Sequence, residues 1–320
     1  MISKNRIEEK KYYYTKDNDY LTNQQRDFYE ENGYLIVRNL VDSDLIDQCR
    51  QRFVDMCNKK VRTKGVSAMK DPHLKKLNVQ GEPAISRIQN IYYDDVLSKY
   101  VTYKPTLDVV QSIIGPNITC CHSMLINKPP NTDENCSRHP LHQDLFFFPY
   151  RPDNSLVVCW TAMETVTKQN GCLFVVPKSH KMGLQSHDYP PVMYPYLCVQ
   201  MLLCMFQNVE NRFFFGVLDA DKYVPVYLPM EKGDTIFFHT LLYHGSGPNL
   251  TKGYRKSLSC HYVNSNATFF METKNKEKLF EKDIIEKWGY GKISFEEFWK
   301  QKCLLVRGSP GKLQGFGSRL

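Results

Sequence analysis

An imidazole and a carboxylate stand two residues apart near the middle of the chain, at His142 and Asp144. In a β-strand successive side chains alternate between two faces, so these two can reach one metal ion while Gln143 points the other way. Two ligands are too few for a metal site, and the third would separate zinc hydrolysis from iron oxygen chemistry. Without a third ligand, the two residues are only a hydrogen-bonded polar pair in a strand.

Two later histidines, His239 and His244, could supply the third ligand. Their odd separation puts them on opposite faces of one strand, so both cannot easily serve together. We favour His244, because a turn at 245–249 follows it and the chain then doubles back through Arg255. A buried metal beside a buried guanidinium makes sense only if an anion sits between them.

Two histidines and one carboxylate on one face of a metal leave about three positions open, which is the arrangement of non-haem Fe(II) oxygenases. A 2-oxoglutarate molecule would fill two of them with its 2-oxo and C1 carboxylate oxygens and leave the last for O2. Its far carboxylate would pair with Arg255, and the Ser246 hydroxyl would add a hydrogen bond. The alternative is a structural zinc, or no metal with Arg255 in an ordinary ion pair.

The composition is that of a folded globular protein. Of 320 residues, 42% are apolar and 24% are charged, and no apolar run approaches the roughly 18 residues of a membrane span. The 11 cysteines include no C-x-x-C pair, so we expect reduced thiols, and the first residues lack the apolar core of a secretory signal. The net charge is +8, but the basic residues form no stripe or recognised motif, which argues against nucleic-acid binding.

The hydrophobic patterns predict a mainly β fold with flanking helices and a double-stranded β-helix core, the jelly roll of cupin-like proteins. Helices are expected after the capping boxes at Thr22 and Ser294, after Asp42 and Ser43, and at 276–288. Short β runs separated by turn residues are expected at 34–37, 118–126, 156–163, 172–176, 224–228, 235–239 and 257–263.

The chain divides into three expected parts: a polar arm at 1–21, one domain at 22–306 with its jelly-roll core at about 84–265, and a Gly-rich flexible tail at 307–320. The tail ends in Ser318-Arg319-Leu320, a close variant of the Ser-Lys-Leu address that the peroxisomal import receptor reads. We therefore expect a peroxisomal location and this receptor as a partner.

Several motifs together resemble those of the phytanoyl-CoA dioxygenase family. They are His142-Gln-Asp144, Trp160-Thr-Ala-Met163, Asn170-Gly-Cys172, Met230-Glu-Lys-Gly-Asp234, His244-Gly-Ser-Gly247, Arg255-Lys256 and Ser259-Cys-His261. The resemblance implies a Fe(II)- and 2-oxoglutarate-dependent 2-hydroxylase of a branched fatty acyl-CoA, phytanoyl-CoA, in peroxisomal α-oxidation. Such an enzyme releases succinate and CO2, and ascorbate keeps its iron reduced.

The family pattern also assigns roles to residues. The iron ligands would be His142, Asp144 and His244, and Arg255 with Ser246 would hold the C5 carboxylate of 2-oxoglutarate. Halogenases on this scaffold have a small residue in place of the carboxylate ligand, so Asp144 favours hydroxylation.

Three more residues acquire a role from the resemblance alone. Met124 and Trp160 would line the 2-oxoglutarate pocket, whereas by residue type they are equally suited to be core residues on strands. Arg87 stands where the family places a lysine that helps to bind the co-substrate, and its planar guanidinium differs in geometry from an ammonium.

The sequence departs from the family at 191–208, where an apolar segment replaces a shorter polar one. This segment is either a lipid-facing lid or non-native sequence from an unspliced intron, and Phe215 stands where the family tends to place a histidine. Two other functions stay open: the same chemistry on another acyl-CoA or small metabolite, and a non-redox metal-binding jelly roll that only recognises a ligand.

Overall fold

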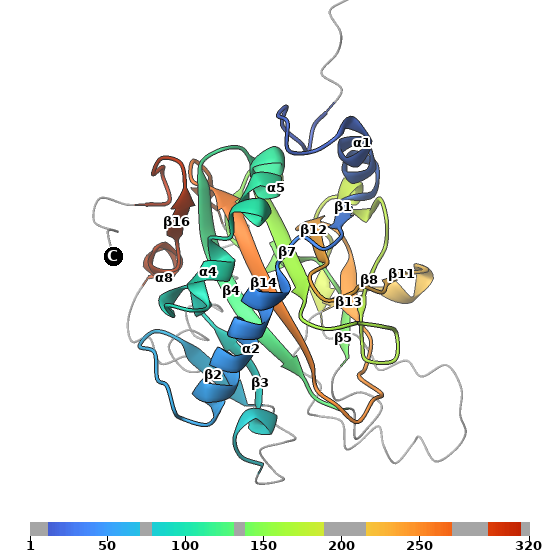
Figure 1. The fold of residues 1–320 in the computed structure, drawn as a ribbon. Helices are drawn as coiled ribbons and strands as arrows, with labels where there is room; N and C mark the ends of the chain where they lie inside the picture. The colour runs from blue at the N-terminus through green and yellow to red at the C-terminus, as the bar shows by residue number, and fades with distance from the viewer. Residues whose placement is uncertain (1–11, 71–78, 131–137, 189–215, 271–293, 315–320) are drawn as a thin grey trace, which may run out of the picture.

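Two antiparallel β-sheets pack against each other in the computed structural model, which describes residues 12–70, 79–130, 138–188, 216–270 and 294–314 (Figure 1). The larger sheet has the order β1 (Tyr34–Val37), β12 (Thr235–His239), β7 (Leu156–Ala162), β14 (Arg255–Asn264), β4 (Ile118–Lys128), β3 (Ile85–Gln89) and β2 (Ser67–Lys70), and β16 (Leu304–Arg307) also pairs with β4. The smaller sheet has the order β11 (Val226–Leu228), β8 (Leu173–Val175), β13 (His244–Ser246) and β5 (His139–His142).

Two short strand pairs complete the β structure, β9 (His187–Asp188) with β10 (Gly216–Val217) and β6 (Tyr150–Arg151) with β15 (Thr268–Phe269). Helices α2 (Ser43–Cys57), α4 (Ser98–Val101) and α5 (Lys104–Ile114) lie over the outer face of the larger sheet (Figure 1). The other helices are α1 (Asn23–Asn32) and α8 (Phe295–Gln301), with 3-10 turns η1 (Glu82–Ala84), η2 (Ile91–Tyr93), η3 (Asp144–Phe146), η4 (Asp153–Ser155), η5 (Ser179–Met182) and η7 (Ala220–Lys222).

This architecture confirms the predicted class, a jelly-roll core with flanking helices. Both predicted capping boxes are present, at Thr22 before α1 and at Ser294 before α8. In each, the cap side chain accepts from the third helical amide, while that residue's side chain reaches back to the cap amide. No helix in the described ranges is long and apolar enough to cross a membrane.

Strand β14 lies between β7 and β4 and is buried along nearly its whole length. Its side chains alternate between the two faces of the larger sheet. Leu258, Cys260 and Tyr262 join the apolar core under α2, α4 and α5, which we call the helix-side core. The alternate residues, beginning with Arg255 and ending with His261, face the space between the two sheets, which we call the barrel interior.

A β-bulge in β4 changes which of its side chains face each side of the sheet. His122 pairs with His261, but the next pair joins Cys120 to Tyr262, so Cys121 is an extra residue in β4. His122 therefore lies beside His261 with 5.2 Å between the ring centroids, and Cys120 joins the helix-side core.

The two ends of the described chain pack on this body. In the predicted arm, Thr15 is 1% exposed and its amide and hydroxyl donate to Glu30 of α1. In the predicted tail, Leu313 is fully buried and its amide donates to the Ser265 carbonyl, so residues 307–314 are not a free tail. The predicted helix at 276–288, the apolar segment at 191–208, Phe215 and the C-terminal tripeptide lie outside the described residues.

Candidate metal centre

His142, Asp144 and His244 lie together in the barrel interior. One ligand atom from each lies within 4.8 Å of the others, and all three residues are buried. The Asp144 Oδ1 atom is 3.3 Å from His142 Nε2 and 3.6 Å from His244 Nε2. His244 is also the cross-strand partner of His142 in the pairing of β13 with β5, so the two rings enter the space from neighbouring strands.

Backbone carbonyls fix the tautomer of both histidines. His142 Nδ1 lies 2.9 Å from the Pro140 carbonyl oxygen, and His244 Nδ1 lies 3.0 Å from that of Leu242. A carbonyl oxygen only accepts, so each Nδ1 carries a proton, and each Nε2 is the ring nitrogen that faces Asp144. The two rings are therefore already oriented as metal ligands.

The prediction that His142 and Asp144 share one strand is wrong in its detail. Strand β5 ends at His142, and Asp144 is the first residue of η3. Gln143 between them is still extended, with φ −118° and ψ 125°, so the two ligands keep a common face. Gln143 points away, as predicted, and its amide nitrogen donates to the carbonyls of Gly183 and Leu241.

Burial and neighbouring charges put Asp144 and His244 in the protonation states that a metal requires. Burial alone would raise the pKa of Asp144, but His244, His261 and His142 outweigh it and hold that pKa well below its ordinary value. Burial, assisted by His142, lowers the pKa of His244 to about 4. An anionic carboxylate beside a neutral imidazole is what a divalent cation binds.

His261 is a contact of the site to which the sequence pattern assigned no role. Its Nε2 atom lies 2.9 Å from Asp144 Oδ2, the oxygen that faces away from the histidine pair. This hydrogen bond fixes the carboxylate and leaves Oδ1 directed at His142 and His244. The spacing offered a signal, because His261 is six residues after Arg255 on one strand and therefore lies on the same face.

His239, the rival third ligand, lies elsewhere. Its ring packs against Tyr14 and His180, with centroid distances of 5.0 and 5.8 Å. Its Nδ1 atom accepts from the Leu241 amide at 3.1 Å. The choice of His244 over His239 therefore agrees with the group that the structure brings together.

Arg255 is a buried cation on the same inner face of β14, and it is 2% exposed. Its guanidinium donates to Ser257 Oγ at 2.8 Å and to the Gly171 carbonyl at 3.1 Å, and it lies 5.3 Å from the ring centroid of Trp160. Burial lowers the pKa of Arg255 to about 10. Within the described part of the chain no carboxylate forms an ion pair with it, so its charge is open to an external anion.

The other residues with a predicted co-substrate role also face the barrel interior. Met124 and Trp160 are the two cross-strand partners of Ser259, one on each side, so the three form a row on one face. Arg87 lies in β3 and pairs with Ile126 of β4. Its charge lowers the pKa of His139 and of His122, although burial and neighbouring histidines lower both pKa values more. The Arg87 Nε atom donates to the Met69 sulfur at 3.1 Å.

Comparison with known proteins identifies the family of this chain. The sequence profile described as phytanoyl-CoA dioxygenase (PhyH) matches residues 29–257. The chain belongs to the phytanoyl-CoA dioxygenase family. It is 41% identical over 302 residues to the peroxisomal phytanoyl-CoA dioxygenase of Rattus norvegicus, across 92% of this chain and 85% of the relative. It is 39% identical over 319 residues to a probable phytanoyl-CoA dioxygenase of Caenorhabditis elegans, across 94% and 97%.

Solved structures share the fold of this phytanoyl-CoA dioxygenase family member. The non-haem α-ketoglutarate-dependent carbocyclase SnoK from nogalamycin biosynthesis matches with a TM-score of 0.56 and 17% identity, over 80% of this chain and 88% of that one. EctD from S. alaskensis, solved with 2-oxoglutarate and 5-hydroxyectoine, matches with a TM-score of 0.56 and 17% identity, over 78% of each chain. Both likenesses support the jelly-roll assignment.

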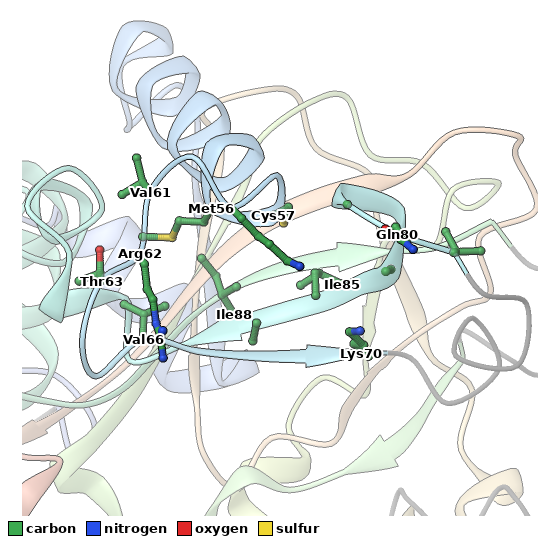
Figure 2. Close-up of a pocket in the computed structure, with 15 residues that line it drawn as sticks. Met56, Cys57, Val61, Arg62, Thr63, Val66, Lys70, Gln80, Ile85 and Ile88 are labelled. Atoms are coloured by element: carbon green, nitrogen blue, oxygen red, sulfur yellow. The ribbon is translucent and has the colours of Figure 1, made fainter.

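A cavity of about 670 Å³ in this family member lies away from the candidate metal centre (Figure 2). It is lined by residues at the end of α2 and in strands β2 and β3, with Ile85 and Ile88 of the helix-side core among them. Its described lining includes Lys59, Arg62 and Lys70 and no acidic residue. Ser86 is an extra residue in the pairing of β3 with β2, so Arg87 faces the barrel interior while Ile85 and Ile88 face the cavity. The cavity and the candidate metal centre are therefore on opposite faces of the larger sheet.

Proposed function

We propose that this protein is a Fe(II)- and 2-oxoglutarate-dependent hydroxylase that places a hydroxyl group on C2 of phytanoyl-CoA or a similar branched fatty acyl-CoA. The observation that carries the proposal is the buried group of His142, Asp144 and His244 with Arg255 on the same inner face. We infer the acyl-CoA substrate from the relatives, several of which are phytanoyl-CoA dioxygenases.

The three clustered residues would hold Fe(II), because two neutral imidazoles and one carboxylate fit this metal and leave positions open for other ligands. When bound, Fe(II) and 2-oxoglutarate together supply the oxidising chemistry: O2 is reduced, 2-oxoglutarate becomes succinate and CO2, and one oxygen atom enters the substrate. Ascorbate would keep the iron ferrous. Asp144 as a ligand supports hydroxylation over halogenation.

Arg255 and Ser246 would bind the distal carboxylate of 2-oxoglutarate. Arg255 offers the guanidinium Nε, which has no partner in the described structure, and a carboxylate can accept from two guanidinium donors at once. Met124 and Trp160 would form the walls of this pocket, and Arg87 would face the co-substrate from β3 in place of the family's lysine.

The test is succinate release by purified protein with Fe(II), 2-oxoglutarate, ascorbate and phytanoyl-CoA. We expect turnover in the wild-type protein and none above background in His142→Ala. Equal succinate in the two proteins would overturn the proposed function. Straight-chain acyl-CoA thioesters and free acids in the same assay distinguish a branched acyl-CoA substrate from another substrate, and tight zinc with no 2-oxoglutarate binding would indicate a protein that only binds a ligand.

We also propose that the protein acts in the peroxisome and is delivered there by the import receptor through Ser318-Arg319-Leu320. Relatives from rat, cow and human are peroxisomal phytanoyl-CoA dioxygenases, which supports this location. A fluorescent protein fused to the amino terminus should give peroxisomal puncta, and deletion of the last three residues should disperse them. Puncta that persist after the deletion would refute the role of the tripeptide.

A further inference from the structure

We propose that Lys128 is a second cation of the 2-oxoglutarate site, where it adds charge for the distal carboxylate and holds the Ser246 hydroxyl as a donor to it. The inference rests on the proposed function for the co-substrate and extends it to a residue that neither the sequence motifs nor the relatives' names assign.

Lys128 is the last residue of β4 and the cross-strand partner of Arg255. It is 6% exposed, so its ammonium is inside the protein and not in the surface layer where most lysines lie. Its Nζ atom donates to Ser246 Oγ at 2.8 Å and to the Gly247 carbonyl at 2.5 Å. The lysine thus directly contacts one of the two residues proposed to bind the distal carboxylate.

Both contacts of the Lys128 ammonium are neutral acceptors. Among the residues that the structure describes, no carboxylate forms an ion pair with either Lys128 or Arg255. Burial and, second, the charge of Arg255 hold the pKa of Lys128 well below its ordinary value. Two buried cations side by side are costly unless an anion lies between them. A dicarboxylate whose far end reaches this position would supply that anion.

The contact with Lys128 also determines what Ser246 can do. An ammonium can only donate, so the Ser246 oxygen accepts from Lys128 and its own hydrogen is left to point elsewhere. A carboxylate can only accept, which makes it the complementary partner. Lys128 therefore positions Ser246 as a donor, in addition to the charge that it contributes.

One glycine lies beside both cations. Gly171 has φ +80°, and a Cβ there would come within 2.6 Å of the Gly247 carbonyl and 3.0 Å of Lys128 Cδ. The Lys128 side chain therefore passes across Gly171, while the Gly171 carbonyl accepts from Arg255. This explains physically why the Asn170-Gly171 turn lies among the motifs of the chain.

Lys256 offers a matched control for Lys128. It is a second buried lysine, 5% exposed, and it pairs with Asn127 in the same β14–β4 ladder. Its ammonium, however, forms an ion pair with Glu82 at 2.6 Å. The two lysines differ in whether their charge already has a partner.

The experiment measures dissociation constants by calorimetry on the Mn(II)-loaded protein without O2, so that binding is read without turnover. The variants are Lys128→Met and Lys256→Met, and the probes are 2-oxoglutarate and 2-oxopentanoate, which lacks the distal carboxylate. We expect Lys128→Met to raise the Kd of 2-oxoglutarate by at least about tenfold, the effect of one charged hydrogen bond. The Kd of 2-oxopentanoate should be unchanged, and Lys256→Met should leave both constants within about twofold of the wild type.

An unchanged Kd of 2-oxoglutarate in Lys128→Met would overturn the inference, and so would an equal loss for both probes. Ser246→Ala tests the positioning role, because the effect of Lys128→Met should shrink in that background. A large fall in the melting temperature of unliganded Lys128→Met would indicate a purely structural lysine and would also count against it. If Arg255→Met abolishes 2-oxoglutarate binding while Lys128→Met does not, the proposed function survives and only this inference fails.

Discussion

The two faces of strand β14 have opposite roles. Toward the helices, Leu258, Cys260 and Tyr262 are fully buried in apolar surroundings. Toward the barrel interior, the same strand presents Arg255 and His261, both buried and both polar. The backbone between them is paired along both edges, with β7 and β4. A single rigid strand thus carries the stabilising contacts on one face and the chemistry on the other.

The difference extends to how each face treats charge. Lys256 reaches Glu82 on one side, whereas Arg255 and its cross-strand partner Lys128 meet only neutral acceptors in the described structure. An unpaired buried charge lowers the stability of the fold, whereas burial of apolar side chains raises it. We infer that the helix-side core offsets the cost of an interior prepared for anionic and metallic ligands.

The largest effect should come from the inner face at Asp144. Asp144→Asn keeps the shape of the side chain but removes the charge that the two histidines surround. We expect Fe(II) affinity to fall by more than about a hundredfold and succinate release to fall to background, because a neutral amide oxygen replaces the anionic ligand. Iron content after anaerobic loading and turnover measure the two effects. Full activity in this variant would contradict the assignment of the metal centre.

The outer face should respond in the opposite way. Leu258→Ala removes a fully buried side chain from the helix-side core and should lower the free energy of unfolding by about 2–5 kcal/mol. The Kd of 2-oxoglutarate for the folded protein should not change. Its neighbour Ser259 lies between Met124 and Trp160 on the wall of the proposed pocket. Ser259→Ala is therefore the matched variant on the inner face: it should cost little stability and should raise that Kd. Urea denaturation and calorimetry distinguish them, and similar profiles for both variants would break the division between the faces.

The sequence was sufficient for the parts of the site that follow local periodicity. The i, i+2 spacing put His142 and Asp144 on one face, and the turn after His244 indicated that Arg255 would return beside it. The capping boxes at Thr22 and Ser294 were also readable, because their partners are three residues away.

Features that depend on pairing between distant strands were not predictable. The extra residue Cys121 shifts the phase of β4, and nothing in the local pattern marks it. In the sequence, Lys128 is an ordinary residue just after a predicted strand. Only the pairing of β4 with β14 shows that it lies opposite Arg255. The 3-10 turn at Asp144 was missed because it begins immediately after an extended residue.

His261 allows a sharper test of the inner face. His261→Phe keeps an aromatic ring but removes the hydrogen bond to Asp144 Oδ2. Partners that orient a ligand typically change metal affinity by about 10- to 100-fold, so we expect a weaker Kd for Fe(II) in that range. Unlike Asp144→Asn, the variant should recover its turnover at saturating iron. If excess iron does not restore turnover, His261 does more than orient the carboxylate.

His239 is a buried histidine without a carboxylate partner in the described structure, and it should make stability depend on pH. Burial, with a contribution from His180, lowers its pKa to about 3. Its Nδ1 accepts from the Leu241 amide, and protonation would destroy that hydrogen bond. Below its ordinary pKa the unfolded chain takes up a proton that the folded protein refuses, so stability falls as pH drops from about 6.5 toward 3.

The size of this effect follows from the shift. At pH 5, about 1.5 pH units below the ordinary pKa of histidine, protonation stabilises the unfolded state by about 2 kcal/mol. His239→Asn keeps an acceptor near the Leu241 amide but cannot titrate, so its free energy of unfolding should fall by about 2 kcal/mol less than the wild type's between pH 7 and pH 5. Urea denaturation at the two pH values measures the difference. Parallel losses in both proteins would show that His239 is protonated equally in the folded and unfolded states, and the acid sensitivity would then belong to the other buried histidines.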